Sequence, residues 1–282
     1  MKTVLELVTL SADFLKKKGI ANSRRQAEEL IGEALGMGRM DLYLQYDRPI
    51  SEAELDRCRE WLVRRSKGEP LQYIQGEVEF HGCRVKVNRH VLIPRQETEI
   101  LVEKISEELG KQSLKGKVLW DICCGSGCIA IALKKRFPDL LVAASDISQN
   151  ALEVAQGNAK QNETEIEFLQ GDLLAPFQGR KADFLVCNPP YVADHEFAGL
   201  DIEVREHEPK LALIGGPTGL EFYRRIKSQL ADCLHKPAKV WFEIGHGQGE
   251  ALKETFSQPP FKNVCLENDW AGKERFFSLE IE

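Results

Sequence analysis

Apolar residues recur every three or four positions through the first 70 residues of the chain, the spacing of an amphipathic helix. One such run starts at Val4, a second starts at Ala27, and a third covers residues 51–67. The third run also carries basic residues, at Arg57, Arg59, Arg64, Arg65 and Lys67. These form either a solvated face or a docking surface for an RNA-bearing or acidic partner. The pattern predicts a helical domain over residues 1–75.

Two short motifs predict where helices of this domain begin. Ser23 with Gln26, and Ser51 with Glu54, fit the capping box, in which a hydroxyl and a longer polar side chain satisfy amides at the helix N-terminus. We therefore expect one helix to start beside Ser23 and another beside Ser51.

After the helical domain, apolar and polar residues alternate at every second position, the period of a β-strand. Residues 76–93 alternate apolar and polar around His81-Gly82, which predicts a β-hairpin linking two domains. Pro94 ends this segment, and helical spacing returns over 97–109. We expect a second domain to occupy residues 94–282.

From residue 117 onward, short apolar strands alternate with helical segments. Helices are predicted over 127–136, 148–161, 219–233 and 247–256. Strands are predicted over 118–122, 140–146, 166–170, 183–188, 239–245, 263–269 and 275–281. This rhythm predicts a mostly parallel sheet that is covered by helices on both faces.

The last two predicted strands are separated only by Trp270 to Glu274, which is too short for a crossover helix. They should therefore pair antiparallel. Six parallel strands that end in one antiparallel hairpin fit the seven-stranded, Rossmann-like sheet of S-adenosylmethionine-dependent methyltransferases better than a dinucleotide-binding sheet. The predicted fold class is thus α/β, with this methyltransferase domain following the small helical domain and the β-hairpin.

Composition and charge narrow the function. The chain has 282 residues, is 43% hydrophobic and carries a net charge of −6, which argues against a strong non-specific nucleic-acid binder. No apolar stretch approaches the roughly 18 residues needed to span a bilayer, and the N-terminus lacks the pattern of a signal peptide. Eight cysteines without such a signal favour free thiols in the cytoplasm.

A glycine-containing loop follows the first strand of the predicted sheet, where ligands bind in such folds. It supplies candidate cofactor-binding residues: Asp121, Cys123, Cys124, Gly125, Ser126 and Gly127. Glycines there let the backbone approach a ligand closely. Asp121 is placed either to meet the amino group of a cationic methionyl part, directly or through water, or to serve as a turn or helix cap.

Asp146 ends the second strand, where a carboxylate can accept both hydroxyl hydrogens of a ribose. The third glycine of a pyrophosphate-binding loop is absent, because Ala130 stands near that position. A nucleoside without a pyrophosphate, such as S-adenosylmethionine, fits better than NAD or FAD. Asp172 and Leu173 follow the third strand, where they can accept from an adenine amino group and pack on its ring; Asp172 could instead cap a turn.

Asn188, Pro189, Pro190 and Tyr191 directly follow the buried fourth strand. Two prolines hold the chain rigid and extended. The Asn188 side-chain oxygen and the Pro189 carbonyl then suit an –NH₂ group, and the Tyr191 ring offers a flat stacking face. Attack of such a nitrogen on a sulfonium methyl moves positive charge onto the nitrogen, which paired acceptors stabilise. A plain strand-exit turn is the other interpretation.

The cysteines and histidines of the chain show no metal-ligand spacing, so no metal site is predicted. Cys123, Cys124, Cys128 and Cys187 are expected to be small buried fillers.

From about residue 20 onward, the chain resembles the bacterial peptide chain release factor glutamine methyltransferases. Besides Asp121 to Gly127 and Asn188 to Tyr191, the resemblance rests on these segments: Glu69 to Ile74, Phe80 to Gly82, Val91 to Glu99, Glu208-Pro209, Ala212 to Gly216, Gly219-Leu220, Phe242 to Gly245 with Gln248, and Asp269 with Gly272, Arg275 and Phe276.

The resemblance implies S-adenosylmethionine as methyl donor and the glutamine amide of the Gly-Gly-Gln motif in release factors as acceptor. It implies that the helical domain helps to hold this protein substrate. By position, Cys123 to Gly127, Asp146, Leu173 and Asn188 contact the cofactor, and Asn188 to Tyr191 hold the glutamine. Arg95 and Glu97 are expected to line the same cleft. A monomer that needs neither nucleic acid nor membrane is expected.

One position departs from the family, which usually has glycine where this chain has Cys123. Cysteine costs roughly 1 kcal/mol there if the backbone needs a positive φ. Two other functions stay open from the residues: methylation of an exocyclic amino group in DNA or RNA, and a catalytically silent cofactor-binding module.

Overall fold

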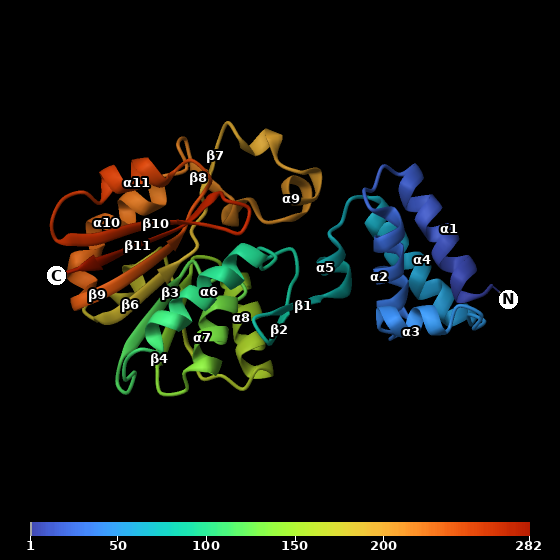
Figure 1. Cartoon of the computed structure of the whole chain (residues 1–282), viewed down its shortest axis with the longest axis horizontal. Helices are drawn as coiled ribbons and strands as arrows, with labels where there is room; N and C mark the ends of the chain where they lie inside the picture. The colour runs from blue at the N-terminus through green and yellow to red at the C-terminus, as the bar shows by residue number, and fades with distance from the viewer. Residues whose placement is uncertain (1) are drawn as a thin grey trace. The chain divides into compact units, whose positions relative to one another are not determined.

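The computed structural model describes residues 2–282, which form two compact units (Figure 1). The first unit contains the chain up to Gly76 together with the distant segment Asp201–His207. The second unit contains Glu77–Leu200 and Glu208–Glu282, so it includes the hairpin. Each unit has its own hydrophobic core.

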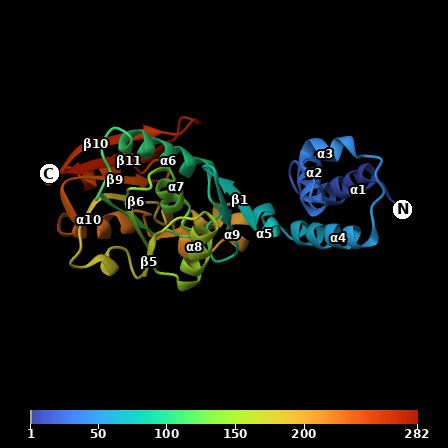
Figure 2. The ribbon, with the colours of Figure 1, turned by 90° about the horizontal axis from the view of Figure 1, so that it is seen from below.

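The first unit is entirely helical (Figure 2). Its helices are α1 (Val4–Lys17), α2 (Ser23–Ala34), α3 (Arg39–Leu44), α4 (Glu52–Ser66), α5 (Leu71–Gln75) and α9 (Ile202–His207). The apolar stripes of α1, α2 and α4 form its core, as their spacing predicted. The sequence pattern did not indicate α3 or α9, because both are only six residues long.

Both predicted helix starts are confirmed, but only one of the two predicted caps is present. The Ser51 hydroxyl accepts from the Glu54 amide while the Glu54 carboxylate accepts from the Ser51 amide. Ser23 instead is the first residue inside α2, which follows the left-handed Asn22 without a side-chain cap. Gln26 donates to the Ala21 carbonyl and accepts from Arg65 at 2.6 Å, so tertiary contacts occupy the side chain that the motif assigned to the cap.

Arg65 is the one residue of the basic run on α4 that the structure shows to be buried, which neither interpretation expected. Its side chain is 1% exposed and donates to Gln26, to the Glu69 carbonyl and to Glu203 of α9. It therefore serves as an internal connector of this unit. Arg57, Arg59 and Lys67 remain exposed.

The second unit is built on a seven-stranded sheet with the order β10-β11-β9-β6-β3-β4-β5. The strands are β3 (Val118–Ile122), β4 (Leu141–Asp146), β5 (Glu167–Gln170), β6 (Ala182–Cys187), β9 (Leu234–Glu243), β10 (Phe261–Asn268) and β11 (Glu274–Ile281). Six of the seven strands run in the same direction, and β11, between β10 and β9, runs in the opposite direction. The predicted fold class and the antiparallel final pair are confirmed.

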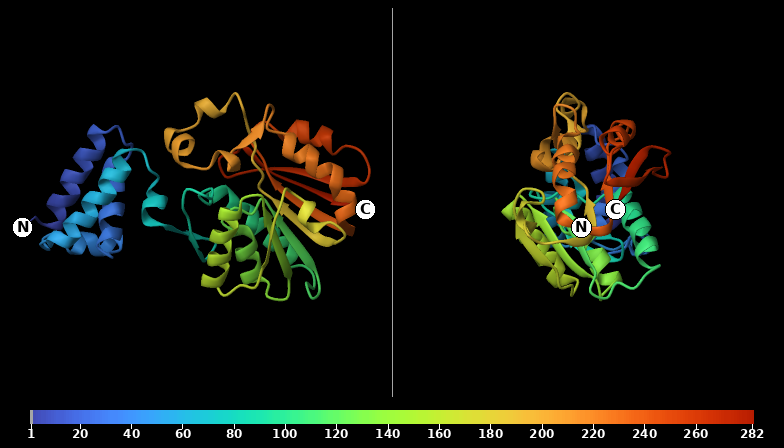
Figure 3. Two further views of the ribbon diagram at one scale, coloured as in Figure 1. Left: turned by 180° about the vertical axis from the view of Figure 1, so that it is seen from behind. Right: turned by 90° about the vertical axis from the view of Figure 1, so that its left-hand side faces the viewer.

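Helices cover the sheet on both faces (Figures 1 and 3). They are α6 (Gln96–Leu109), α7 (Cys128–Arg136), α8 (Gln149–Gln161), α10 (Glu221–Cys233) and α11 (Gly249–Thr255). Because the chain moves in opposite directions from the central strands β3 and β6, right-handed crossovers place α7 and α8 opposite α10 and α11. The change of direction between β3 and β6 creates the crevice where such sheets bind ligands.

The predicted hairpin is confirmed as β1 (Glu77–Phe80) and β2 (Cys83–Lys86), with both turn residues, His81 and Gly82, at positive φ. The Asn158 amide of α8 accepts from the Lys86 amide at 2.7 Å and donates to its carbonyl at 3.0 Å. The same amide group donates to the Ser126 carbonyl at 3.0 Å. Asn158 therefore ties the hairpin to the glycine-containing loop.

Short elements before and after β6 complete the second unit. They are the two-strand pair β7 (Val192–Ala193) and β8 (Ile214–Gly216), and the 3₁₀ turns Ala175–Phe177, Phe197–Gly199 and Lys210–Ala212.

Candidate active site

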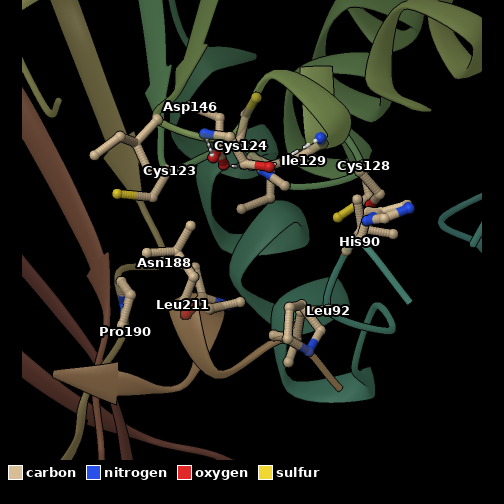
Figure 4. Close-up of a pocket in the computed structure, with 18 of the residues that line it drawn as sticks. His90, Leu92, Cys123, Cys124, Cys128, Ile129, Asp146, Asn188, Pro190 and Leu211 are labelled. Carbon is tan, nitrogen blue, oxygen red and sulfur yellow. Dashed lines mark hydrogen bonds between the residues drawn. The ribbon is translucent and has the colours of Figure 1, made fainter. Parts of the chain in front are cut away.

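A cavity of about 260 Å³ lies at the carboxyl ends of the parallel strands (Figure 4). Its wall brings together residues from the segment after the hairpin, the loops after β3, β4, β5 and β6, and α10. The predicted site residues that line it are Arg95, Cys123, Cys124, Gly125, Ser126, Asp146, Asp172, Leu173, Asn188 and Pro190. Asp121, Gly127, Glu97, Pro189 and Tyr191 are not among its lining residues.

The loop after β3 turns through three left-handed residues, Cys123 at φ +60°, Gly125 at φ +53° and Gly127 at φ +76°. A Cβ built on Gly125 meets no atom within 4 Å, so a side chain there would take up open space in the cavity. Gly127 is needed for packing, because its Cβ would lie 3.1 Å from the Ala155 Cβ on α8. The glycines thus keep the loop flat against the cavity and close to α8.

Cys123 adopts a left-handed conformation that glycine would take without strain. An L-residue in the left-handed region costs roughly 1–2 kcal/mol. The half-buried Cys123 packs against the sheet core and lines the cavity. This chain therefore carries strain in the floor of its candidate active site.

Asp146 braces this loop from the end of β4. One carboxylate oxygen accepts from the Gly125 amide at 2.9 Å and the other from the Ser148 amide at 2.9 Å. Burial raises the pKa of Asp146, although these amide hydrogen bonds lower it. Each oxygen retains a lone pair, so the carboxylate can still accept ligand hydroxyls.

Asp121 lies beneath the cavity instead of in its wall. It is 0% exposed, and one oxygen accepts from the Ala130 amide of α7 at 3.1 Å. Its other oxygen is buried without a hydrogen-bond partner among the described residues. Burial raises the pKa of Asp121 to about 8. The geometry favours the helix-cap interpretation of Asp121 over direct contact with a methionyl group.

Asp172 and Leu173 lie at the cavity wall beyond β5. The Asp172 carboxylate pairs with Arg225 of α10, which lines the cavity as well. Leu173 is buried and also has a positive φ, of +53°. A ring that enters this end of the cavity meets a fixed apolar side chain and a carboxylate that already has a cationic partner.

The loop Asn188 to Tyr191 is held by glycines and by Gln248. A Cβ on Gly215 would lie 2.6 Å from the Pro190 carbonyl oxygen, and one on Gly219 would lie 2.3 Å from the Tyr191 carbonyl oxygen. The Gln248 amide donates to that Tyr191 oxygen at 2.9 Å. Only glycine leaves room for the loop at positions 215 and 219, which lie far from the loop in sequence. The sequence analysis had given these two glycines no role.

A buried carboxylate lies behind this loop, on the last residue of β9. Glu243 is 1% exposed; it accepts from the Thr98 hydroxyl at 2.6 Å and from the Tyr191 hydroxyl at 3.5 Å. Thr98 in turn accepts from the Asn188 amide at 3.4 Å. Burial raises the pKa of Glu243 to about 7, while hydrogen bonds with Thr98 and with the Asn188 side chain, and the charge of Arg275, lower it. The sequence analysis gave Glu243 and Thr98 no role, although both lie in segments that carry the family resemblance and Glu243 is an acid within an apolar strand.

Tyr191 and Arg95 occupy positions that their sequence patterns did not specify. The Tyr191 ring packs on the sheet core, and burial raises the pKa of its hydroxyl. Arg95 lines the cavity and pairs with Glu208, which also accepts from the Ile93 amide at 3.2 Å. Glu208 thereby fixes the segment that precedes α6.

The cavity fits S-adenosylmethionine in its donor and acceptor set. The flat loop at Gly125 leaves room for backbone contact, Asp146 has free lone pairs for a ribose, and Leu173 offers a face for a ring. Residues 2–282 contain no cluster of three or more His, Cys, Asp or Glu side chains arranged to hold a metal. Within the same range, no helix is both long and apolar enough to cross a bilayer.

Two family models match the chain. The PrmC N-terminal domain matches residues 6–76, and the methyltransferase small domain matches residues 96–203. The first match covers the helical unit from residue 6 to Gly76, and the second covers β3 to β6 with the loops after these strands.

Curated relatives match over nearly the full length. The release factor glutamine methyltransferase of Chlamydia trachomatis serovar D is 41% identical over 277 residues, which are 98% of this chain and 93% of the relative. That of Geobacter sulfurreducens is 38% identical over 273 residues, covering 97% and 95%. The solved structure of the T. thermophilus 16S rRNA N2 G1207 methyltransferase in complex with AdoMet and guanosine is similar in fold, with a TM-score of 0.52 at 15% identity. The match covers 73% of this chain and 50% of that one. This likeness shows the fold alone.

Proposed function

This chain belongs to the release factor glutamine methyltransferase family, and on that premise we propose that it methylates the side-chain amide nitrogen of the glutamine in the Gly-Gly-Gln motif of peptide chain release factors. S-adenosylmethionine is the methyl donor, and it supplies a methyl group on a positively charged sulfur. The observation that carries the proposal is Asn188 at the cavity wall, on a loop that Gly215, Gly219 and Gln248 hold rigid.

The residues of the cavity divide the work between donor and acceptor. Asp146 accepts from ribose hydroxyls, Leu173 packs against the adenine, and the loop from Cys123 to Gly127 binds the methionyl part through its backbone. The Asn188 side-chain oxygen at the cavity wall accepts a hydrogen of the glutamine amide, and the Pro189 carbonyl, the second acceptor expected from the sequence, lies outside that wall. The hydrogen bond to Asn188 orients the nitrogen lone pair along the line of attack and stabilises the positive charge that develops on the nitrogen.

The proton released by the nitrogen needs no strong base, because the N–H becomes acidic as the new bond forms. We further propose that the helical unit holds the release factor, that the enzyme acts as a monomer without nucleic acid, and that it works in the cytoplasm. All eight cysteines are free, which suits a reducing compartment.

Asn188→Ala tests the assignment directly. The variant loses its main acceptor for the glutamine amide, so the rate of methyl transfer should fall by about 100-fold or more, the range for removing one group that stabilises transition-state charge. Purified release factor and labelled S-adenosylmethionine supply the assay, with mass mapping of the modified residue. The dissociation constant for S-adenosylmethionine should change by less than about threefold, or roughly 0.6 kcal/mol.

Two controls make the result specific. Asn268→Ala changes the same residue type on the exposed edge strand β10 and should leave the rate unchanged. A release factor with alanine in place of the glutamine should accept no methyl group. Wild-type activity in Asn188→Ala would refute the role of Asn188, and labelling of RNA in place of the release factor would refute the proposed substrate.

A further inference from the structure

Three side chains from separate elements are connected by hydrogen bonds that start at Asn188 and Thr98 in the cavity wall and end at the buried Glu243. The Asn188 amide nitrogen donates to the Thr98 hydroxyl at 3.4 Å, and this hydroxyl donates to Glu243 at 2.6 Å. We propose that Glu243 is a positioning residue which, through Thr98, determines which end of the Asn188 carboxamide faces the substrate. The inference rests on the function proposed above and deepens it.

The donor and acceptor in each of these hydrogen bonds follow from the number of hydrogens that the three side chains have available. An ionised carboxylate only accepts, so Thr98 must give its single hydroxyl hydrogen to Glu243. The Thr98 oxygen can then only accept from Asn188, which turns the Asn188 –NH₂ group toward Thr98. The Asn188 oxygen is left for the cavity. The two ends of a carboxamide have nearly the same shape, so hydrogen bonding is what distinguishes them.

The orientation matters because the substrate group is itself an amide –NH₂. A reversed Asn188 would present its own –NH₂ group to that of the glutamine, and two donors would face each other. The acceptor needed for the developing positive charge would be missing. The loop that holds Asn188 fixes its backbone but leaves the side-chain amide free to rotate by half a turn, so a separate device is required.

Glutamine at position 243 should reverse the direction of these hydrogen bonds, although its side chain has almost the same shape as that of glutamate. The Tyr191 hydroxyl donates to one oxygen of Glu243 at 3.5 Å, and Thr98 donates to the other. In Glu243→Gln, the carbonyl oxygen suits Tyr191, and the –NH₂ group then faces Thr98. Thr98 becomes the acceptor on that side and gives its hydrogen to the oxygen of Asn188. The –NH₂ group of Asn188 then points into the cavity.

Protonation should have the same effect as this substitution, since a neutral carboxylic acid can donate to Thr98. Burial raises the pKa of Glu243 to about 7, so this change of protonation falls near neutral pH. Ionisable groups face Glu243 from five places: Glu97 on α6, Cys128 on α7, Tyr191 after β6, Tyr223 on α10 and Arg275 on β11. Among these, Glu97 raises the pKa and Arg275 lowers it.

The test compares wild type with Glu243→Gln, Thr98→Val and Thr98→Ser, using the release factor as substrate. Glu243→Gln and Thr98→Val should lower kcat by about 10-fold to 100-fold, within the range for misplacing one transition-state contact. KM for the release factor and the affinity for S-adenosylmethionine should change by less than about threefold. Thr98→Ser retains the hydroxyl and should restore most of the wild-type kcat.

The matched control is Ser106→Ala on the same helix. The Ser106 hydroxyl is buried and has no hydrogen-bond partner among the described residues, so its loss should not affect kcat. The pH profile of kcat supplies the readout that a merely structural role would not change. The wild-type profile should lose activity as the pH falls through about 7, and this acidic limb should disappear in Glu243→Gln.

A second readout does not require turnover. The side-chain amide signal of Asn188 in a ¹⁵N-labelled sample, identified by its loss in Asn188→Ala, should shift with pH around 7 in wild type and stay fixed in Glu243→Gln. Wild-type kcat in both Glu243→Gln and Thr98→Val, or an Asn188 signal that ignores pH, would overturn the inference. If the wild-type protein does not methylate the release factor, the proposed function fails, while the amide signal still decides the role of Glu243.

Discussion

Replacing Cys123 by glycine and, separately, by alanine measures the strain in the cavity floor. Cys123 lies at φ +60°, where an L-residue costs roughly 1–2 kcal/mol and glycine costs almost nothing. Glycine also gains freedom in the unfolded chain, which offsets about 0.5–1 kcal/mol of that relief. Both variants lose the same thiol contacts with the sheet core. Cys123→Gly should therefore be more stable than Cys123→Ala by about 0.5–1 kcal/mol.

The comparison reverses the usual order, because alanine is normally the more stable of the two within regular structure. Urea unfolding measures the free-energy difference, and the fluorescence of the buried Trp120 and Trp241 follows the unit that contains Cys123. If Cys123→Ala equals or exceeds Cys123→Gly in stability, the left-handed backbone at this position imposes no strain and the reasoning fails.

Two further predictions concern the carboxylates of the second unit. Asp146→Ala should weaken S-adenosylmethionine binding by about 1–3 kcal/mol, the range for leaving buried hydrogen-bond partners unmet, and an unchanged calorimetric dissociation constant would contradict its ribose role. The free energy of unfolding should fall as the pH rises from about 5 to 8, because burial raises the pKa of Asp121 to about 8 and that of Glu243 to about 7, so the folded state binds more protons than the unfolded state in this window. Denaturant titrations across this range measure the trend, which should be weaker in Glu243→Gln.

Much of the second unit could be predicted locally. The strand patterns at 118–122 and 275–281 reappear as β3 and β11 with little change, because short buried strands alternate with helices whose spacing is visible in a single window of sequence. The same holds for the hairpin at His81-Gly82, where two adjacent residues with positive φ define the turn. The local pattern was misleading at Ser23, because Gln26 makes its contacts with Arg65 and Ala21 instead of with a helix cap.

The candidate site divides along the same line. Asn188, Asp146 and the loop around Gly125 follow strand ends, and the carboxyl ends of parallel strands must meet at one edge of a sheet, so the sequence was sufficient to place them at the cavity. The position of Cys123 in a family glycine loop likewise raised the question of a positive φ, and the structure answered it.

The sequence by itself thus determined the α/β architecture and the chemistry presented at the ends of its strands, since both depend on residues that are near one another in the chain. Tertiary structure alone decided that Asp121 is a buried helix cap, that Glu208 holds Arg95, and that Thr98 connects Asn188 to Glu243. In the last connection, Asn188 and Thr98 are 90 positions apart in the chain, and Thr98 and Glu243 are 145 positions apart. Burial and hydrogen-bond direction arise only when α6, β6 and β9 pack together, so no local pattern of the chain contains them.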